Sequence, residues 1–371
     1  MSLKILHTSD IHLGMKFAGY PDVQSKLSQA RFESLNKLVD KANEKKCDLF
    51  VISGDTFDRV GVVKKDIKRA SDILKNFQGS LVTVLPGNHD FISKGHKDLW
   101  FHFKDNMADN VLVLEERRMY PLEHYGLDIN LYACPCNSKH SSENAVGWIK
   151  EEEKDSQVTY HIGIAHGSLD GFSPDFDKKY YPMTVQELKK CGLDLWLLGH
   201  THTQYPVKPG VSDNIFFPGT PEPDGFDCQH DGKAWFIETD DKKKIHPVLL
   251  PTGTFRFLHE EVKVNSAKDI KRLERRFSSD DYKQTLLKLK ISGSLPNDEY
   301  KNMSELRKIL NSQLFYLSLN EDGLTEKITI DIINQEYSEG SFPHKMLSEL
   351  AHDPESLQIA YDIMREVGKC S

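Results

Sequence analysis

The chain has 371 residues, of which 38% are hydrophobic and 10% aromatic, a composition typical of a globular protein that excludes a disordered one. Its formal net charge of −8 argues against a surface coated in positive charge for nucleic acid, although local basic stretches or bound metal ions could still attract phosphate. No apolar run is long enough to cross a membrane, and the opening MSLKILHTSD does not have the pattern of a signal peptide. The six scattered cysteines are expected to be free thiols in a reducing cytoplasm.

The first 250 residues or so alternate between apolar runs and helical patterns. Several apolar runs are continuous, which predicts strands buried on both faces. Apolar residues recur at spacings of three and four in residues 25–46 and 64–77, which predicts two helices. The predicted strands lie within residues 4–10, 47–55, 80–88, 110–114, 127–135, 160–167, 194–200 and 214–220. This order predicts an α/β architecture with functional groups at the carboxyl ends of strands, completed by antiparallel strands or a second packed sheet.

The pattern changes near residue 255, where Pro and Gly punctuate the sequence and polar clusters at strand ends disappear. We therefore predict one domain over residues 1–255 and a small α+β domain over residues 256–371. In the second domain the sequence predicts strands at 258–264, 285–293, 315–320 and 328–334 and helices at 267–277 and 301–313. Residues 342–369 predict two short helices separated by the sequence His352-Asp353-Pro354.

Five predicted strand ends each carry Asp, Asn or His, with glycines that allow tight turns. Buried polar groups are costly unless they are used, so we expect these side chains to share a function. Imidazole and carboxylate together suit Mn, Fe, Co, Ni or Zn better than Ca or Mg. Seven ligands exceed the needs of one ion, but two ions that share Asp55 would each receive four; the candidates are Asp10, His12, Asp55, Asn88, His166, His200 and His202.

The ordered motifs DxH, GDxxDR, GNHD, HG and GHTH resemble those of the calcineurin-like metallophosphoesterase superfamily. The resemblance implies a four-layer β-sandwich flanked by helices and a two-metal phosphoesterase. It assigns one ion to Asp10, His12, Asp55 and His202 and the other to Asp55, Asn88, His166 and His200. It also implies that His89 is the catalytic histidine, which protonates the leaving oxygen or stabilises the pentavalent state, and that Asp90 orients His89.

Within the superfamily, LHTSDIHLGMKF and PGTPEPDGFD resemble the SbcD-type DNA repair nucleases. Asp58 stands where archaeal and eukaryotic members carry histidine, and the closing FPHKMLSELAHDPESLQIAYDIMREV resembles the YhaO-type bacterial branch. The resemblance implies a DNA exonuclease or endonuclease activated by Mn, a capping role for the C-terminal domain, and an SbcC-type, SMC-like ATPase partner. A homodimer is left open.

The sequence places DNA contacts less specifically. Arg59, Lys64, Lys65 and Arg69 are candidate phosphate ligands, and the stretch KRLERRF at 271–277 is a second basic segment, although either could be an ordinary solvated helix face. Asp58 could also be a turn cap and Arg59 a surface ion-pair residue. Two other functions are considered: a phosphodiesterase or phosphatase for small molecules or phosphoproteins, and a noncatalytic scaffold. The complete ligand set and His89 argue against the scaffold.

Overall fold

The computed structural model describes residues 2–93, 99–210, 213–228 and 230–369. The chain forms two compact units, Met1–Phe257 and Leu258–Ser371, so the division lies two residues after the predicted position 255. Each unit has hydrophobic clusters of its own. Of the helices in the described part of the chain, none combines the length and apolar character that a bilayer crossing requires.

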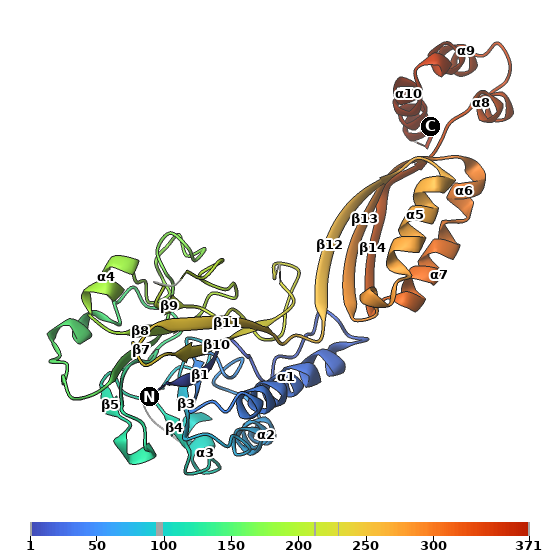
Figure 1. The fold of residues 1–371 in the computed structure, drawn as a ribbon. Helices are drawn as coiled ribbons and strands as arrows, with labels where there is room; N and C mark the ends of the chain where they lie inside the picture. Colours follow the sequence, from blue (N-terminus) through green and yellow to red (C-terminus); the bar gives the residue numbers. More distant parts are fainter. Residues whose placement is uncertain (1, 94–98, 211–212, 229, 370–371) are drawn as a thin grey trace. The chain divides into compact units, whose positions relative to one another are not determined.

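The first sheet of the first unit has the strand order β11-β10-β1-β2-β3-β4 (Figure 1). Strands β1 to β4 run parallel, and β10 and β11 complete the sheet as antiparallel members. All five residues of both β2 and β3 are buried, as their continuous apolar runs predict. The strands are β1 (Lys4–Thr8), β2 (Leu49–Ser53), β3 (Leu81–Leu85), β4 (Val111–Val113), β10 (Lys233–Thr239) and β11 (Ile245–Pro251).

A second sheet, of order β5-β6-β7-β8-β9, packs against the first. Side chains such as Ile5 and Val51 of the first sheet and Ile164 and Leu197 of the second share one buried cluster. Strand β5 is antiparallel to β6, and the other neighbours are parallel. The strands are β5 (Met119–Pro121), β6 (Ile129–Cys134), β7 (Tyr160–His166), β8 (Leu195–Gly199) and β9 (Ile215–Phe216).

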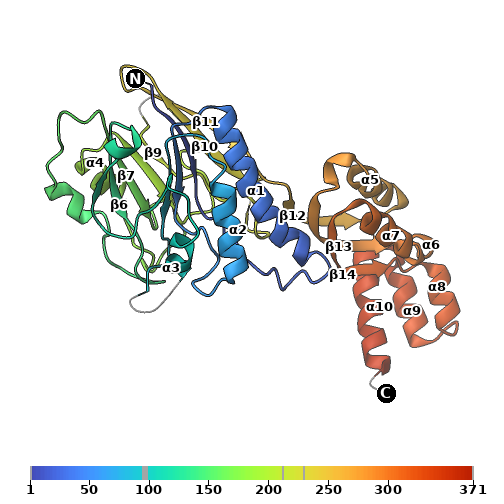
Figure 2. The same cartoon turned by 90° about the horizontal axis from the view of Figure 1, so that it is seen from below.

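Helices cover both outer faces of this sandwich. On the first sheet lie α1 (Gln24–Glu44), α2 (Lys64–Leu74) and α3 (Leu99–Lys104), with α1 and α2 side by side (Figure 2). On the second sheet lie α4 (Val185–Lys190) and the short η2 (Gly147–Glu151), while η1 (Glu123–Tyr125) follows β5. The predicted four-layer α/β sandwich is therefore confirmed, as are the two helices predicted within residues 25–46 and 64–77.

The second unit contains a three-stranded sheet of order β12-β13-β14 and four later helical segments (Figure 1). Helices α5 and α7 bury one face of this sheet around Leu273, Leu289 and Leu306. The last helices form a separate cluster around Ile333, Leu347 and Tyr361. The elements are β12 (Arg256–Val264), α5 (Ala267–Phe277), η3 (Asp280–Tyr282), β13 (Thr285–Leu295), α6 (Asn297–Lys301), α7 (Met303–Gln313), β14 (Tyr316–Glu326), α8 (Ile330–Glu336), α9 (Phe342–Glu349), η4 (Leu350–His352) and α10 (Pro354–Lys369).

One prediction for the second unit is wrong. The sequence predicts a strand at residues 328–334, but helix α8 begins within them. Thr329 caps this helix, because its hydroxyl accepts a hydrogen bond from the Ile332 N–H. Ile333 is fully buried against the last helices, so helical packing outweighs the β-branched composition. The two short helices predicted within residues 342–369 are confirmed as α9 and α10.

Candidate metal centre

The structure brings all seven predicted ligands together at the carboxyl ends of strands from both sheets. Asp10 and His12 follow β1, Asp55 follows β2, Asn88 follows β3, His166 ends β7, and His200 and His202 follow β8. Five of them are 2% exposed or less, whereas His200 and His202 are half-buried. The site therefore has a buried floor and an accessible side.

The first ligand cluster consists of Asp10, His12 and His202, with Asp55 at its edge. The Nε2 atoms of His12 and His202 lie 3.2 Å apart. His202 Nε2 lies 3.7 Å from Asp10 Oδ1, and His12 Nε2 lies 3.8 Å from Asp55 Oδ2. These four side chains can therefore surround one cation.

The second ligand cluster consists of Asp55, Asn88, His166 and His200. Asn88 Oδ1 lies 2.9 Å from His166 Nε2 and 3.0 Å from His200 Nδ1, and Asp55 Oδ2 lies 3.3 Å from His166 Nε2. His166 Nδ1 lies 2.9 Å from the Ser53 carbonyl oxygen, an acceptor that requires the proton on Nδ1. In the neutral imidazole the lone pair of Nε2 then faces Asp55 and Asn88, as a metal ligand requires.

The donor set of both clusters fits divalent metal. Asp10 Oδ1 is buried and has no hydrogen-bond partner, and several nitrogen and oxygen atoms with lone pairs face one another at short range. Such an arrangement is unfavourable unless protons or a cation lie between the atoms. Imidazole, carboxylate and one amide oxygen together suit a transition metal.

The backbone is strained at the ligands. Asp10, His12, Asp55 and His200 have φ values of 54°, 49°, 51° and 106°, in the left-handed region that side chains rarely adopt. The adjoining glycines permit close approach. A Cβ atom at Gly54 would lie 1.9 Å from His166 Nδ1, and one at Gly87 would lie 2.2 Å from Asp55 Oδ1. These contacts explain why glycine precedes the ligands Asp55 and Asn88.

Burial and neighbouring charge oppose each other at the ligands. Burial raises the pKa of Asp10, and the charge of Asp55 adds to this effect. Burial also disfavours ionised Asp55, yet His166 holds the pKa of Asp55 below its usual value. Burial would lower the pKa of His166, but Asp55 raises it to about 9, and Asp224 likewise raises the pKa of His202 to about 9. Because a metal must displace these protons, its affinity should fall as pH falls.

His89 stands beside the ligands, and its contacts are with Asp55 and Asp58. Its backbone N–H donates to Asp55 Oδ1 at 2.8 Å, and its Nδ1 lies 2.9 Å from the Asp58 carbonyl oxygen. The family resemblance predicts that Asp90 orients His89, but the buried Asp90 carboxylate instead accepts the backbone N–H groups of Gly87 at 2.7 Å and Phe57 at 2.9 Å. The Asp90 carboxylate therefore ties the turn at Gly87 to Phe57 in the loop after β2, while the His89 ring contacts Asp58, and a role of Asp90 in orienting His89 stays a prediction.

Two residues near the site are not among those that the sequence predicts. Asp224 Oδ2 lies 3.0 Å from His202 Nδ1, and Arg31 Nη2 lies 3.6 Å from the same oxygen. Asp224 belongs to the PGTPEPDGFD segment, which served only as a resemblance to a family and did not assign a role to any of its residues. Arg31 lies on the apolar face of α1. Its helical spacing with the apolar residues of that face is the sequence signal that could have identified it as a buried arginine.

A cavity of about 400 Å³ opens beside the ligands, and its lining includes Asn88, His89, His200 and His202. Tyr180 also lines it and stacks near His200, with ring centroids 4.8 Å apart. A substrate in this cavity can therefore reach both ligand clusters and His89.

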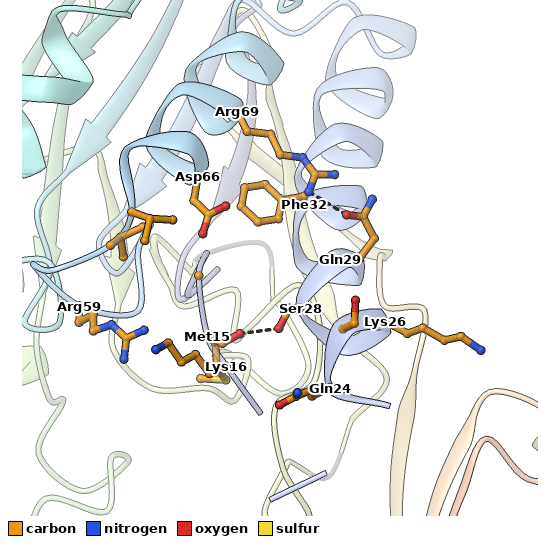
Figure 3. Close-up of a pocket in the computed structure, with 14 residues that line it drawn as sticks. Met15, Lys16, Gln24, Lys26, Ser28, Gln29, Phe32, Arg59, Asp66 and Arg69 are labelled. Atoms are coloured by element: carbon orange, nitrogen blue, oxygen red, sulfur yellow. Dashed lines mark hydrogen bonds between the residues drawn. The ribbon is translucent and has the colours of Figure 1, made fainter. Parts of the chain in front are cut away.

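A second hollow, the basic cleft, lies between the beginnings of α1 and α2 (Figure 3). It has a volume of about 590 Å³, and its charged lining residues are Lys16, Lys26, Arg59, Arg69 and Asp66. Of the predicted DNA contacts, Arg59 and Arg69 line it. Lys64 and Lys65 are exposed at the start of α2 but do not line this hollow.

Contacts hold Arg69 in a defined position within the basic cleft (Figure 3). Its Nη1 donates to Gln29 Oε1 at 2.7 Å, and its guanidinium carbon lies 4.1 Å from the centroid of the Phe32 ring. Arg59 is 44% exposed, and its nearest acidic oxygen, on Asp58, is 3.9 Å away. In the second basic segment, by contrast, Arg276 Nη1 donates a hydrogen bond to Glu260 Oε2 at 2.6 Å, so this guanidinium already has a counter-charge within the protein.

A family model described as calcineurin-like phosphoesterase matches residues 3–204. The match covers more than half of the chain and includes all seven candidate ligands and His89, so the chain belongs to the calcineurin-like phosphoesterase family. The predicted superfamily is confirmed, and a metal-dependent phosphoesterase is the class of enzyme that the family and the site define.

Individual relatives are more distant. The chain is 25% identical over 226 residues to the uncharacterized metallophosphoesterase YhaO of Bacillus subtilis, covering 58% of this chain and 52% of that protein. It is 21% identical over 262 residues to the DNA double-strand break repair protein Mre11 of Methanopyrus kandleri, covering 66% and 52%. The Mre11 of Saccharolobus solfataricus is 26% identical over 227 residues, covering 59% and 55%. The matches span about half the length of these relatives.

Removal of metal should abolish phosphodiester hydrolysis, because the two ligand clusters would then hold no cation to offset charge on the phosphate oxygens or to lower the pKa of the attacking water. We expect protein treated with EDTA to be inactive toward bis-p-nitrophenyl phosphate, and Mn to restore activity better than Mg because imidazole ligands favour transition metals. Undiminished hydrolysis in metal-free protein would contradict the assignment.

Proposed function

We propose that the chain is a DNA nuclease of the SbcD type that hydrolyses phosphodiesters at a two-metal site. The observation that carries this proposal is that the two ligand clusters share Asp55, with His89 beside them at the wall of an open cavity. We assign one ion to Asp10, His12, Asp55 and His202 and the other to Asp55, Asn88, His166 and His200. Mn is the expected ion, with Fe, Co, Ni or Zn as alternatives.

The proposed chemistry divides between the ions and His89. Two divalent ions at roughly 3.5–4 Å would offset charge on the phosphate oxygens and lower the pKa of the attacking water. His89 presents Nε2 for catalysis, because its Nδ1 bonds the Asp58 carbonyl oxygen. When the ring carries a proton on both nitrogens, Nε2 can donate a proton or a hydrogen bond to the leaving oxygen from this position.

Two observations support DNA as the substrate. The two Mre11 relatives are named for DNA double-strand break repair. In the basic cleft three cationic side chains, Lys16, Arg59 and Arg69, face one carboxylate, while Lys26 at its edge points away (Figure 3), a local excess of positive charge on a chain whose net charge is −8. Arg59 and Arg69 would contact phosphate there, because Arg69 is already oriented by Gln29 and Phe32.

The second unit and the partner belong to the same proposal. We assign residues 258–371 a capping role over bound DNA and propose an SbcC-type ATPase as the partner. Helix α10 supports a partner surface, because Ile359 and Ile363, one turn apart, are 56% and 55% exposed. The five described cysteines are free, as expected for the predicted cytoplasmic location, which stays a prediction. A homodimer stays open.

The alternative is a phosphodiesterase or phosphatase for small molecules or phosphoproteins. It is favoured by the volume of the cavity beside the ligands, about 400 Å³, which is the size of a small-molecule site. End-labelled single- and double-stranded DNA, tested with Mn beside bis-p-nitrophenyl phosphate, distinguishes the two functions. Cleavage of the diester without cleavage of either DNA would favour the alternative.

Replacing His89 separates catalysis from metal binding. His89→Gln should keep both ions and lower turnover by roughly 10²–10⁴-fold, the usual effect of removing a general acid. Asn88→Ala is the matched comparison and should weaken one ion, because its Oδ1 faces two histidines. Metal content and turnover are measured on the same samples, and metal loss in His89→Gln with none in Asn88→Ala would reverse the two roles.

The basic cleft predicts a change in salt dependence. Arg59→Gln with Arg69→Gln should weaken DNA binding and lower the slope of log affinity against log salt by about 0.9 for each duplex phosphate that the variant no longer neutralises. Hydrolysis of the small diester should be unaffected, since neither residue lines the cavity beside the ligands. Lys189→Gln, an exposed change on α4, is the control, and an equal change in slope there would refute a specific contribution of the cleft.

Removal of the second unit separates the small substrate from DNA. A chain that ends at Phe257 keeps every proposed ligand and the contacts of the Phe257 ring with Tyr20 and Phe226. It should still hydrolyse bis-p-nitrophenyl phosphate but cleave duplex DNA poorly, because the proposed cap and partner surface are gone. Equal loss on both substrates would mean that the second unit only stabilises the fold. Unchanged DNA cleavage would remove the capping role.

A further inference from the structure

Arg31 is a buried cation in the middle of α1. Its side chain is 0% exposed on a helix face otherwise formed by residues such as Leu27 and Leu35. A guanidinium does not lose its proton in proteins, so a buried one needs acceptors or a counter-charge. Its Nη1 donates to the Ile11 carbonyl oxygen at 2.6 Å, and its Nη2 lies 3.6 Å from Asp224 Oδ2.

The first contact fixes the backbone between two candidate ligands. Ile11 separates Asp10 from His12, which both have left-handed backbone angles, with φ of 54° and 49°. Such conformations persist only where surrounding contacts enforce them. The hydrogen bond from Arg31 holds the peptide at Ile11, and the Thr220 hydroxyl holds the adjoining Asp10 carbonyl oxygen at 2.9 Å.

The second contact reaches the third ligand of the same cluster. Asp224 is 11% exposed and bonds His202 Nδ1 at 3.0 Å. This bond fixes the ring, and the opposite atom, Nε2, faces Asp10 and His12. A carboxylate behind a metal-binding histidine orients the ring and increases its basicity. Arg31 supplies Asp224 with a buried counter-charge 3.6 Å away, which holds the carboxylate in place behind the ring.

The second ligand cluster has other supports. His166 is held by the Ser53 carbonyl oxygen, and the Asn88–His89 turn is held by Asp55 and by the Asp90 carboxylate. The hydrogen bond and the ion pair of Arg31 lead directly to the peptide between Asp10 and His12 and, through Asp224, to His202. They reach the second cluster only at a further step, through the His200 N–H that donates to Asp10 Oδ2 at 3.0 Å and the His12 N–H that donates to the Asp55 carbonyl oxygen at 3.0 Å. One arginine on α1 therefore supports three ligands of a single ion position.

We propose that Arg31, acting through the Ile11 carbonyl oxygen and through Asp224, is a positioning residue for the first ligand cluster alone. The inference rests on the proposed two-ion site and extends it, because it makes the occupancy of one ion position depend directly on α1, whereas the other position depends on α1 only through the shared Asp55 and the contact of Asp10 with His200. It requires no particular substrate. A wild-type chain that binds two ions but leaves DNA uncut would refute the proposed nuclease and leave this inference intact.

The test counts ions. Mn²⁺ is titrated into the full-length, metal-free chain, with calorimetry for affinity and electron paramagnetic resonance for the spin-coupled pair of ions. Arg31→Met and Asp224→Asn should each retain one ion within about threefold of its wild-type affinity and weaken the other by roughly 10–100-fold, the usual effect of removing a group that orients a metal ligand. The signal of the coupled pair should then give way to that of a single ion. Lys37→Met, an exposed change on the same helix, should bind two ions like the wild type.

Further variants separate positioning from folding. Arg31→Lys keeps the charge, but a single ammonium does not span both acceptors. The affinity of this variant for its more weakly bound ion should therefore lie between the affinities of the wild type and of Arg31→Met. If Arg31→Met does not fold, Asp224→Asn decides, since it preserves shape at a less buried position. Equal weakening of both ions in Asp224→Asn, or two ions bound with wild-type affinity, would overturn the proposal.

Discussion

Two cations can share a site of this kind only if one carboxylate faces both, and Asp55 is the residue that meets this constraint. Its Oδ2 lies 3.8 Å from His12 in the first ligand cluster and 3.3 Å from His166 in the second, while its Oδ1 accepts the His89 N–H at 2.8 Å. One side chain, 1% exposed and just after β2, therefore contacts both ligand clusters and the proposed acid.

The fold places Asp55 where it can do this. The central strands of both sheets run parallel, and loops at their carboxyl ends meet where the two sheets pack face to face. Glycines at 54 and 87 bring the backbone against His166 and Asp55. Burying carboxylates and imidazoles so close together costs free energy in the absence of metal, and bound cations make the arrangement favourable. Stability of the loops and occupancy by metal are thus coupled.

The sequence predicted the parts of the molecule that follow from local rules. Continuous apolar runs identified the buried strands, and polar residues at their ends identified the seven candidate ligands, whose side chains lie together in the structure. The rest depends on tertiary contacts. The Asp90 carboxylate bonds backbone N–H groups that no side-chain motif records, and the place of Arg31 on the apolar face of α1 does not reveal its partners Ile11 and Asp224, which only the packed fold brings to it. Residues 330–336 form a helix because Ile333 packs against later helices, a contact that residues 328–334 do not encode.

The most direct test of the account is an anomalous difference map recorded at the Mn absorption edge from crystals of the full chain grown with Mn. The account predicts two peaks roughly 3.5–4 Å apart, with Asp55 between them, one bordered by Asp10, His12 and His202 and the other by Asn88, His166 and His200. A single peak, or two peaks that do not share Asp55, would contradict it.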